Sequence, residues 1–214
     1  MIQKETLMIV GIFNLPTALS FVGLILSILA CIFSFNKYIE LSIICLMYAG
    51  LADLFDGFLA RKLKIKTEEK MFGIQIDSII DMASFGLVPV IILLHYGFNT
   101  IIAYILFFIY CCCAAMRLAY FNCLKLKDNK EIKYYTGLPV TYSALIIPLA
   151  FISSGFLPDY IFEIVIYIII LIISLLFILK IPILKPRGVF YILFPIIAVV
   201  LSIYWIGVMI TRYY

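Results

Sequence analysis

Four aspartates in one stretch of the chain are the residues best suited to chemistry. Asp53 and Asp56 are three residues apart, and Asp77 and Asp81 are four apart, in sequence that is otherwise mostly apolar. On an α-helix, residues at these spacings lie on one face, one turn above the other. If residues 51–89 form two antiparallel helices, the four carboxylates meet across the pair.

Such a cluster needs positive charge beside it. An ionised carboxylate is costly inside a membrane bundle, and neighbouring like charges repel one another. The stretch contains no His or Cys. Carboxylate oxygens without those ligands favour hard cations such as Mg²⁺ or Mn²⁺, and two ions about 3.5–4 Å apart commonly share several carboxylates. The spacing therefore predicts two divalent ions, for which a diphosphate is the natural ligand.

Small residues accompany the aspartates on both expected helices. Gly57 and Ala60 fall on the face of the first pair, and Gly73 and Ser84 extend the stripe of the second. Small side chains leave room for a bulky ligand to approach the backbone. The polar segment 62–70 between the two runs is typical of a turn.

These residues match a known pattern. The chain resembles the CDP-alcohol phosphatidyltransferases, integral membrane enzymes that move a phosphatidyl group from a CDP-linked lipid to an alcohol. The resemblance rests on Asp53-x-x-Asp56-Gly57-x-x-Ala60-Arg61 followed by Gly73-x-x-x-Asp77-x-x-x-Asp81. Residues 62–72 separate the two halves and are more numerous than is usual in the family. We expect the additional residues to lengthen a surface loop.

Further residues resemble one branch of that family, the CDP-diacylglycerol–serine phosphatidyltransferases. Met82 follows the last aspartate, where the glycerol-phosphate branch usually has lysine and the inositol branch arginine. Three runs are similar to the serine branch: Asp77-Ser78-x-x-Asp81-x-x-Ser84-Phe85-Gly86-x-x-Pro89, Arg117-Leu118-Ala119-Tyr120-Phe121-Asn122 and Gly137-Leu138-Pro139. The resemblance implies transfer of a phosphatidyl group from CDP-diacylglycerol to L-serine, which yields phosphatidylserine and CMP.

The resemblance also implies roles for individual residues. Asp53, Asp56 and Asp77 would hold the two ions, Mg²⁺ or Mn²⁺, with help from Asp81, which would also act as general base. Arg117 would bind the serine carboxylate. The residues expected to contact the CDP-linked lipid are Asn14, Thr17, Gly57, Ala60, Arg61, Thr67 and Gly73. A homodimer in a prokaryotic cytoplasmic membrane is the expected setting.

Other interpretations remain open at this point. Asn14 suits a helix cap, Thr67 a solvated loop, and Arg117 a side chain that extends from a helix end towards water. The same chemistry could act on another alcohol, such as glycerol 3-phosphate or an inositol phosphate. The four carboxylates could instead form the ion site of a small cation transporter, or belong to a catalytically idle scaffold.

The composition places these motifs in a membrane. Of the 214 residues, 66% are hydrophobic and 13% are charged, which is typical of an all-α integral membrane protein. We expect one polytopic helical bundle, a single domain over residues 1–214, with six to eight transmembrane helices. Seven apolar runs approach the length of a span, the fifth being the shortest: Leu15–Phe35, Ile39–Leu63, Phe72–His95, Thr100–Leu124, Thr136–Ser154, Tyr160–Leu179 and Val189–Ile210.

Charge placement predicts the orientation of the bundle. Of the 16 Lys and Arg residues, only Lys37 and Arg212 fall on one side if the amino terminus lies in the cytoplasm, so the positive-inside rule favours that arrangement. The aspartate cluster then opens towards the cytoplasm of a multi-pass cell-membrane protein. The net charge of +4 fits this topology and attraction to anionic headgroups, and no separate basic domain suggests a nucleic-acid partner.

Overall fold

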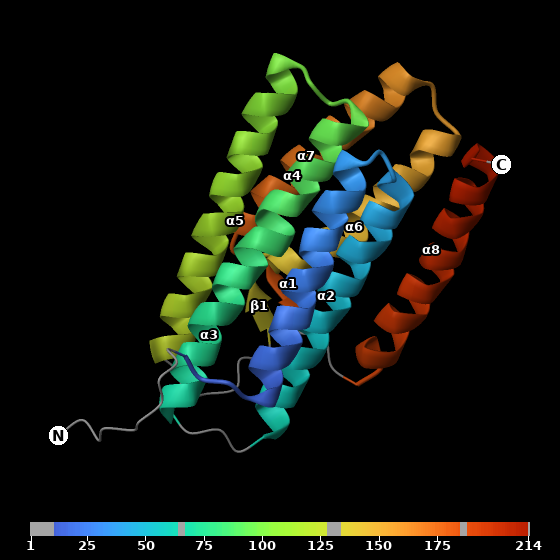
Figure 1. The fold of residues 1–214 in the computed structure, drawn as a ribbon. Helices are drawn as coiled ribbons and strands as arrows, with labels where there is room; N and C mark the ends of the chain where they lie inside the picture. The colour runs from blue at the N-terminus through green and yellow to red at the C-terminus, as the bar shows by residue number, and fades with distance from the viewer. Residues whose placement is uncertain (1–10, 64–66, 128–133, 185–187, 214) are drawn as a thin grey trace.

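The computed structural model describes residues 11–63, 67–127, 134–184 and 188–213, and most of them are helical. Long helices run side by side along one bundle (Figure 1). The elements in chain order are α1 Leu15–Phe35, α2 Ile39–Lys62, α3 Thr67–Asp81, the π-helical η1 Met82–Leu87, α4 Val88–Tyr96, α5 Ile101–Lys127, β1 Tyr134–Thr136, the 3₁₀ turn η2 Val140–Tyr142, α6 Ser143–Phe151, the 3₁₀ turn η3 Ile152–Gly155, α7 Asp159–Ile178, β2 Pro182–Leu184 and α8 Phe190–Tyr213.

Within the described residues, six helical stretches are long and apolar enough to cross a membrane. They are Leu15–Phe35, Ile39–Ala60, Glu69–Tyr96, Ile101–Leu124, Asp159–Ile178 and Phe190–Arg212. Their outward faces carry many exposed large apolar side chains, as expected of surfaces that contact lipid. The predicted all-α membrane bundle, with six to eight transmembrane helices, is confirmed.

The fifth predicted run, Thr136–Ser154, is not one long helix. Its first residue belongs to β1, and η2, α6 and η3 follow in succession. Gly137 adopts a φ of +80°, and Pro148 lies within α6, where a proline removes a helical hydrogen bond. The segment still passes along the bundle, since it begins beside Ile181 at one end and brings Phe151 against Tyr96 at the other.

The loop between the two aspartate-bearing helices is shorter than the sequence predicted. Helix α2 continues through Lys62 and α3 begins at Thr67, so the additional residues lengthen a helix. Glu69 lies in the first turn of α3, where negative charge interacts favourably with the helix dipole. The expectation of a long surface loop over 62–72 was therefore wrong.

Helices α1 and α2 make the most extensive helix pair. The buried face of α1 is a stripe of small residues: Pro16, Thr17, Ser20, Gly23, Ser27, Ala30 and Ser34. A Cβ on Gly23 would lie 3.4 Å from Cβ of Ala52, and the Ser42 hydroxyl donates to the Ala30 carbonyl at 2.6 Å. Small side chains permit this close approach, which is a usual basis of helix packing in membranes.

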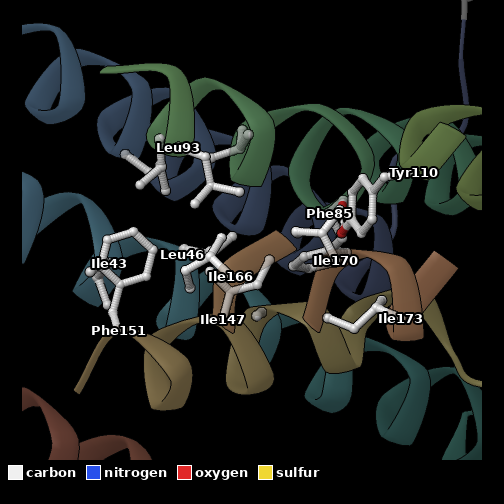
Figure 2. Packing of buried hydrophobic residues seen from close by; sticks show 14 of the residues in the cluster. Ile43, Leu46, Phe85, Leu93, Tyr110, Ile147, Phe151, Ile166, Ile170 and Ile173 are labelled. Atoms are coloured by element: carbon white, nitrogen blue, oxygen red, sulfur yellow. Dashed lines mark hydrogen bonds between the residues drawn. The ribbon is translucent and has the colours of Figure 1, made fainter. Parts of the chain in front are cut away.

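An apolar core lies between α2, η1, α6 and α7. Figure 2 shows Leu46, Phe85, Ile147 and Ile166 converging from α2, η1, α6 and α7. All four are at most 1% exposed. Together with hydrogen bonds from α5 and α6, this core holds in place η1, the segment that directly follows the last aspartate.

The two ends of the bundle differ in their basic residues. Lys37 donates to the His95 carbonyl at 3.2 Å, and Arg212 pairs with the buried Glu40 at 3.0 Å, so both cations expected on one side lie at the same end (Figure 1). At the other end, β1 and β2 form a short antiparallel pair in which Tyr135 faces Ile183. Lys62 also lies at that end, at the close of α2.

Candidate active site

Three aspartates converge between α2 and α3. One carboxylate oxygen from each of Asp53, Asp56 and Asp77 lies within 4.8 Å of the others. Asp81 follows one helical turn after Asp77 and lines the same small pocket. Asp56 and Asp81 are 5% and 8% exposed, whereas the other two are half-buried. The structure thus brings the four predicted carboxylates to one place.

The pocket has walls from four elements. Helices α1, α2 and α3 and the π-helical η1 each contribute residues. The lining consists of Ser20, Gly23, Ala49, Asp53, Asp56, Asp77, Ile80, Asp81, Ser84 and Phe85. Apart from the carboxylates, the polar groups in this wall are the hydroxyls of two serines.

Two hydroxyl groups orient the carboxylates of α2. Ser20 donates to Asp56 Oδ2 at 2.5 Å, and Thr141 donates to Asp53 Oδ2 at 2.7 Å. A hydrogen bond to one oxygen of a carboxylate limits its rotation and leaves the other oxygen to face a ligand. Neither residue was identified from the sequence.

The sequence contained a usable signal for only one of the two. Ser20 follows Thr17 by three residues on the small, polar stripe of α1, so a helical-wheel argument could have placed it beside α2. Thr141 lies 88 residues after Asp53, and no spacing rule connects the two. The contact exists because Gly137 turns the chain and η2 carries Thr141 towards α2.

The π-helical segment after Asp81 is held from outside by α5 and α6. The Tyr110 hydroxyl donates to the Phe85 carbonyl at 2.6 Å, and the Ser143 hydroxyl approaches the same oxygen at 3.4 Å. The Cys111 thiol contacts the Gly86 carbonyl at 3.3 Å. Single π-helical turns within α-helices are frequent at functional sites, and this one forms part of the pocket wall.

Two of the three runs that resembled the serine branch meet in space, the one that begins at Asp77 and the one that begins at Arg117. Ser78, next to Asp77, donates to Asn122 Oδ1 at 2.8 Å, so the end of α5 is connected to α3 beside the aspartates. Asn122 closes the run that begins at Arg117. This contact aligns α5 with the site.

The residues predicted to contact the CDP-linked lipid fall into three groups. Gly57 is half-buried and Ala60 exposed, on the α2 helix that carries Asp53, and a Cβ on Gly73 would meet nothing within 4 Å. None of these three lines the small pocket. Arg61 and Thr67 have helical backbones, but their side chains lie outside the described part of the structure.

Asn14 and Thr17 form the start of α1. The Asn14 side-chain oxygen accepts from the Thr17 amide at 3.0 Å and from its hydroxyl at 2.9 Å. Asn14 is therefore the helix cap that its position suggested. Thr17 is buried one turn before Ser20, which places the capped end of α1 beside the aspartate cluster.

Arg117 lies in a different pocket. It is 5% exposed, and its Nε and Nη2 donate to the carbonyls of Leu138 and Gly137 at 3.1 and 3.4 Å. The pocket around it is lined by Met116, Arg117, Tyr120, Phe177, Ile178, Leu179 and Lys180. No residue of this lining belongs to the aspartate pocket.

The donor set in the aspartate pocket suits hard cations. Three carboxylates supply oxygen atoms at mutual distances compatible with a shared ion, and no histidine or cysteine lines the described pocket. Oxygen-only sites select Mg²⁺, Mn²⁺ or Ca²⁺ over softer metals. The residues present therefore fit the divalent ions expected from the sequence.

Comparison with known proteins agrees with this site. The model of the CDP-alcohol phosphatidyltransferase family matches residues 13–211, a range that contains all four aspartates. The chain belongs to the CDP-alcohol phosphatidyltransferase family. Its similarity therefore extends from the start of α1 to the end of α8, well beyond the aspartate motif.

Three relatives are named for the synthesis of serine-containing lipids. A CDP-diacylglycerol–serine O-phosphatidyltransferase of Methanocaldococcus jannaschii is 33% identical over 136 residues, which are 64% of this chain and 59% of the relative. One of Saccharomyces cerevisiae is 31% identical over 114 residues, 50% of this chain and 40% of the relative. An archaetidylserine synthase of Methanothermobacter thermautotrophicus is 30% identical over 146 residues, 66% of this chain and 59% of the relative. The chain thus matches less than two thirds of the length of each.

Proposed function

We propose that this protein transfers the phosphatidyl group of CDP-diacylglycerol to L-serine, forming phosphatidylserine and CMP. The observation that carries the proposal is the convergence of Asp53, Asp56 and Asp77 within 4.8 Å in a chain whose residues 13–211 match a phosphatidyltransferase family. A cluster of carboxylates that binds divalent ions is suited to a diphosphate, since the ions offset the charge of both partners.

The proposed metal site uses Asp53, Asp56 and Asp77, with Asp81 as an additional ligand. When bound, two Mg²⁺ or Mn²⁺ ions would neutralise the diphosphate and the charge that develops on CMP as it leaves. Thr141 and Ser20 keep the α2 carboxylates oriented through their hydrogen bonds. The protein's part is to hold these ligands in place before the substrate arrives.

Asp81 is the proposed general base. It would accept the proton of the serine hydroxyl while the serine oxygen forms a bond to the phosphorus that carries diacylglycerol. The bond from that phosphorus to the oxygen shared with CMP breaks, and its electron pair leaves with CMP. The position of Asp81 supports this role, because it lines the pocket one turn beyond the three clustered carboxylates.

Serine is the proposed acceptor because two relatives are named for transfer to serine and a third for archaetidylserine. Arg117 is the proposed partner of the serine carboxylate. It is the one buried basic side chain among the described residues, and a buried guanidinium is a strong partner for a carboxylate. Glycerol 3-phosphate and inositol phosphate are the competing acceptors, and the family match favours any of these transfers over cation transport.

The remaining proposals concern ligand contacts and setting. Asn14, Thr17, Gly57, Ala60, Arg61, Thr67 and Gly73 are proposed to contact the CDP-linked lipid, and the open space beside Gly73 supports its inclusion. The Lys62 end of α2 is opposite the end that holds Lys37 and Arg212 (Figure 1), and the positive-inside rule therefore places it in the cytoplasm. Asp53 lies nine residues, about 14 Å, from this end, so the site is proposed to face the cytoplasm. A homodimer is proposed from family membership alone.

The test is the transfer of labelled L-serine into lipid by the purified protein in vesicles that contain CDP-diacylglycerol. We expect label in the lipid fraction with Mn²⁺ or Mg²⁺, loss of incorporation with a chelator, and recovery when the ion is restored. Binding of Mn²⁺ measured separately by electron paramagnetic resonance should weaken in Asp56→Asn. Incorporation that survives chelation would overturn the metal-dependent scheme.

A further inference from the structure

Ser84 has a feature that the proposed chemistry has not yet used. Its side chain is 1% exposed, and its Oγ has no hydrogen-bond partner among the described residues. Buried hydroxyls are nearly always hydrogen-bonded, because leaving one unpaired costs free energy. The same side chain lines the aspartate pocket, one turn after Asp81.

The helix around Ser84 differs from a regular α-helix. Two buried serines on regular helices, Ser174 and Ser202, donate to the carbonyl four residues earlier, each at 2.7 Å, whereas the buried Ser27 on α1 has no such partner. Ser84 lies instead in the π-helical η1, whose i to i+5 hydrogen bonds change the geometry of the turn. Its hydroxyl has no such local partner, and unlike Ser27 it lines a pocket where a ligand could supply one.

Two backbone carbonyls of η1 accept hydrogen bonds from neighbouring helices, so the unpartnered group is the Ser84 hydroxyl at the pocket. Tyr110 and Ser143 both approach the Phe85 carbonyl, and Cys111 approaches that of Gly86. These contacts come from α5 and α6 and hold the segment from outside. They leave Ser84 as the group of η1 that offers a hydroxyl to the pocket.

We infer that Ser84 contacts the acceptor alcohol, forming a hydrogen bond to a polar atom of that substrate beside Asp81. The inference rests on the proposed function and adds an acceptor-binding residue to it. The donor lipid is held through its diphosphate at the carboxylate cluster, whereas Ser84 adjoins the residue proposed to deprotonate the acceptor. Ser84 should therefore affect acceptor binding and leave lipid binding unchanged.

The experiment measures CMP release by Ser84→Ala, Ser84→Thr and Ser27→Ala beside the wild type, varying acceptor, CDP-diacylglycerol and Mn²⁺ in turn. Ser27 is the matched control, since it is also buried and unpartnered but lines neither pocket described above. We expect Ser84→Ala to raise the KM for the acceptor about three- to tenfold, the usual effect of losing one neutral hydrogen bond. Ser84→Thr should recover much of this loss, and Ser27→Ala should resemble the wild type.

If the wild type releases CMP, three results would overturn the inference alone. An unchanged acceptor KM in Ser84→Ala would show that the hydroxyl does not contact the acceptor. An equal rise in both substrate KM values would indicate general disturbance of the site, and a raised Mn²⁺ requirement would place Ser84 on the metal. If the wild type uses another alcohol in place of serine, the KM for that alcohol is measured in each variant. The inference about Ser84 is then tested in the same way, and only the proposed acceptor is replaced. No CMP release with any acceptor would overturn the proposed function together with this inference.

Discussion

At the scale of single residues, the site is a set of carboxylates held by hydroxyls. Asp53 and Asp56 share a helix face, as their spacing predicted, and Asp77 completes the cluster from α3. The hydroxyls of Ser20 and Thr141 were not predicted, although each bonds one of the α2 carboxylates. Spacing identifies residues that share a helix, whereas partners from distant segments depend on the packing of the whole bundle.

The aspartates should act as a unit. Replacing Asp53, Asp56 or Asp77 by Asn removes an anionic ligand, and Asp81→Asn removes the proposed base. Each change should lower the rate of CMP release at least about a hundredfold. Glu163→Gln is the control, because this half-buried carboxylate lies on α7 away from the site. A near wild-type rate in any aspartate variant would remove that residue from the mechanism.

Thr141 should tune the metal site through Asp53. Thr141→Val keeps the shape of the side chain and removes the donor, so we expect about tenfold weaker Mn²⁺ binding, a usual effect for a group that orients a metal ligand. Thr141→Ser should restore most of the affinity. Titration of Mn²⁺ by electron paramagnetic resonance measures this directly, and unchanged affinity in Thr141→Val would show that the hydrogen bond has no influence on the ion.

Replacing Arg117 tests whether this side chain binds the carboxylate of the acceptor serine. If its guanidinium binds the serine carboxylate, Arg117→Ala should raise the KM for serine about tenfold or more and change the KM for CDP-diacylglycerol less than about twofold. The structure also shows this guanidinium on the carbonyls of Gly137 and Leu138. A fall in kcat with unchanged KM for serine would assign Arg117 to supporting that turn.

At the scale of elements, apolar length was a good guide to the long helices and a poor one to the fifth run. Leu15–Phe35 was predicted at its observed bounds. The segment after Gly137 was apolar enough to suggest a span, but a positive φ at Gly137 and 3₁₀ turns on both sides of α6 divide it into short pieces. The same interruption brings Thr141 to Asp53, so the simple pattern fails where the chain contributes a contact to the candidate site.

Close packing of α1 on α2 should be essential to stability. Ala30 is fully buried, and its carbonyl accepts from Ser42 of α2. Ala30→Leu should destabilise the protein by about 1–3 kcal/mol through overpacking and lower its melting temperature in detergent. Val22→Leu changes an exposed position of the same helix and should have little effect. Equal melting temperatures for the two variants would contradict the packing argument.

At the scale of the whole molecule, composition predicted a membrane bundle and the structure confirms it. The match over residues 13–211 shows the family that the motif suggested, and the fold gathers the four aspartates of that motif at one pocket. Orientation, the extent of the domain and a homodimer stay predictions, since they depend on lipid, on charge at the membrane surface or on a second chain. Lys37 and Arg212, the two basic residues that share one end of the bundle, remain the basis for placing that end on the side of the membrane away from the cytoplasm.

The measurement that tests the central proposal most directly is CMP release by the purified protein with CDP-diacylglycerol and Mn²⁺. L-serine, glycerol 3-phosphate, inositol phosphate and no acceptor are compared in parallel. We predict CMP release that depends on L-serine, with phosphatidylserine as the lipid product. Release that depends on another acceptor would contradict the assignment to serine, and no release under any of the four conditions would contradict the proposed transfer itself.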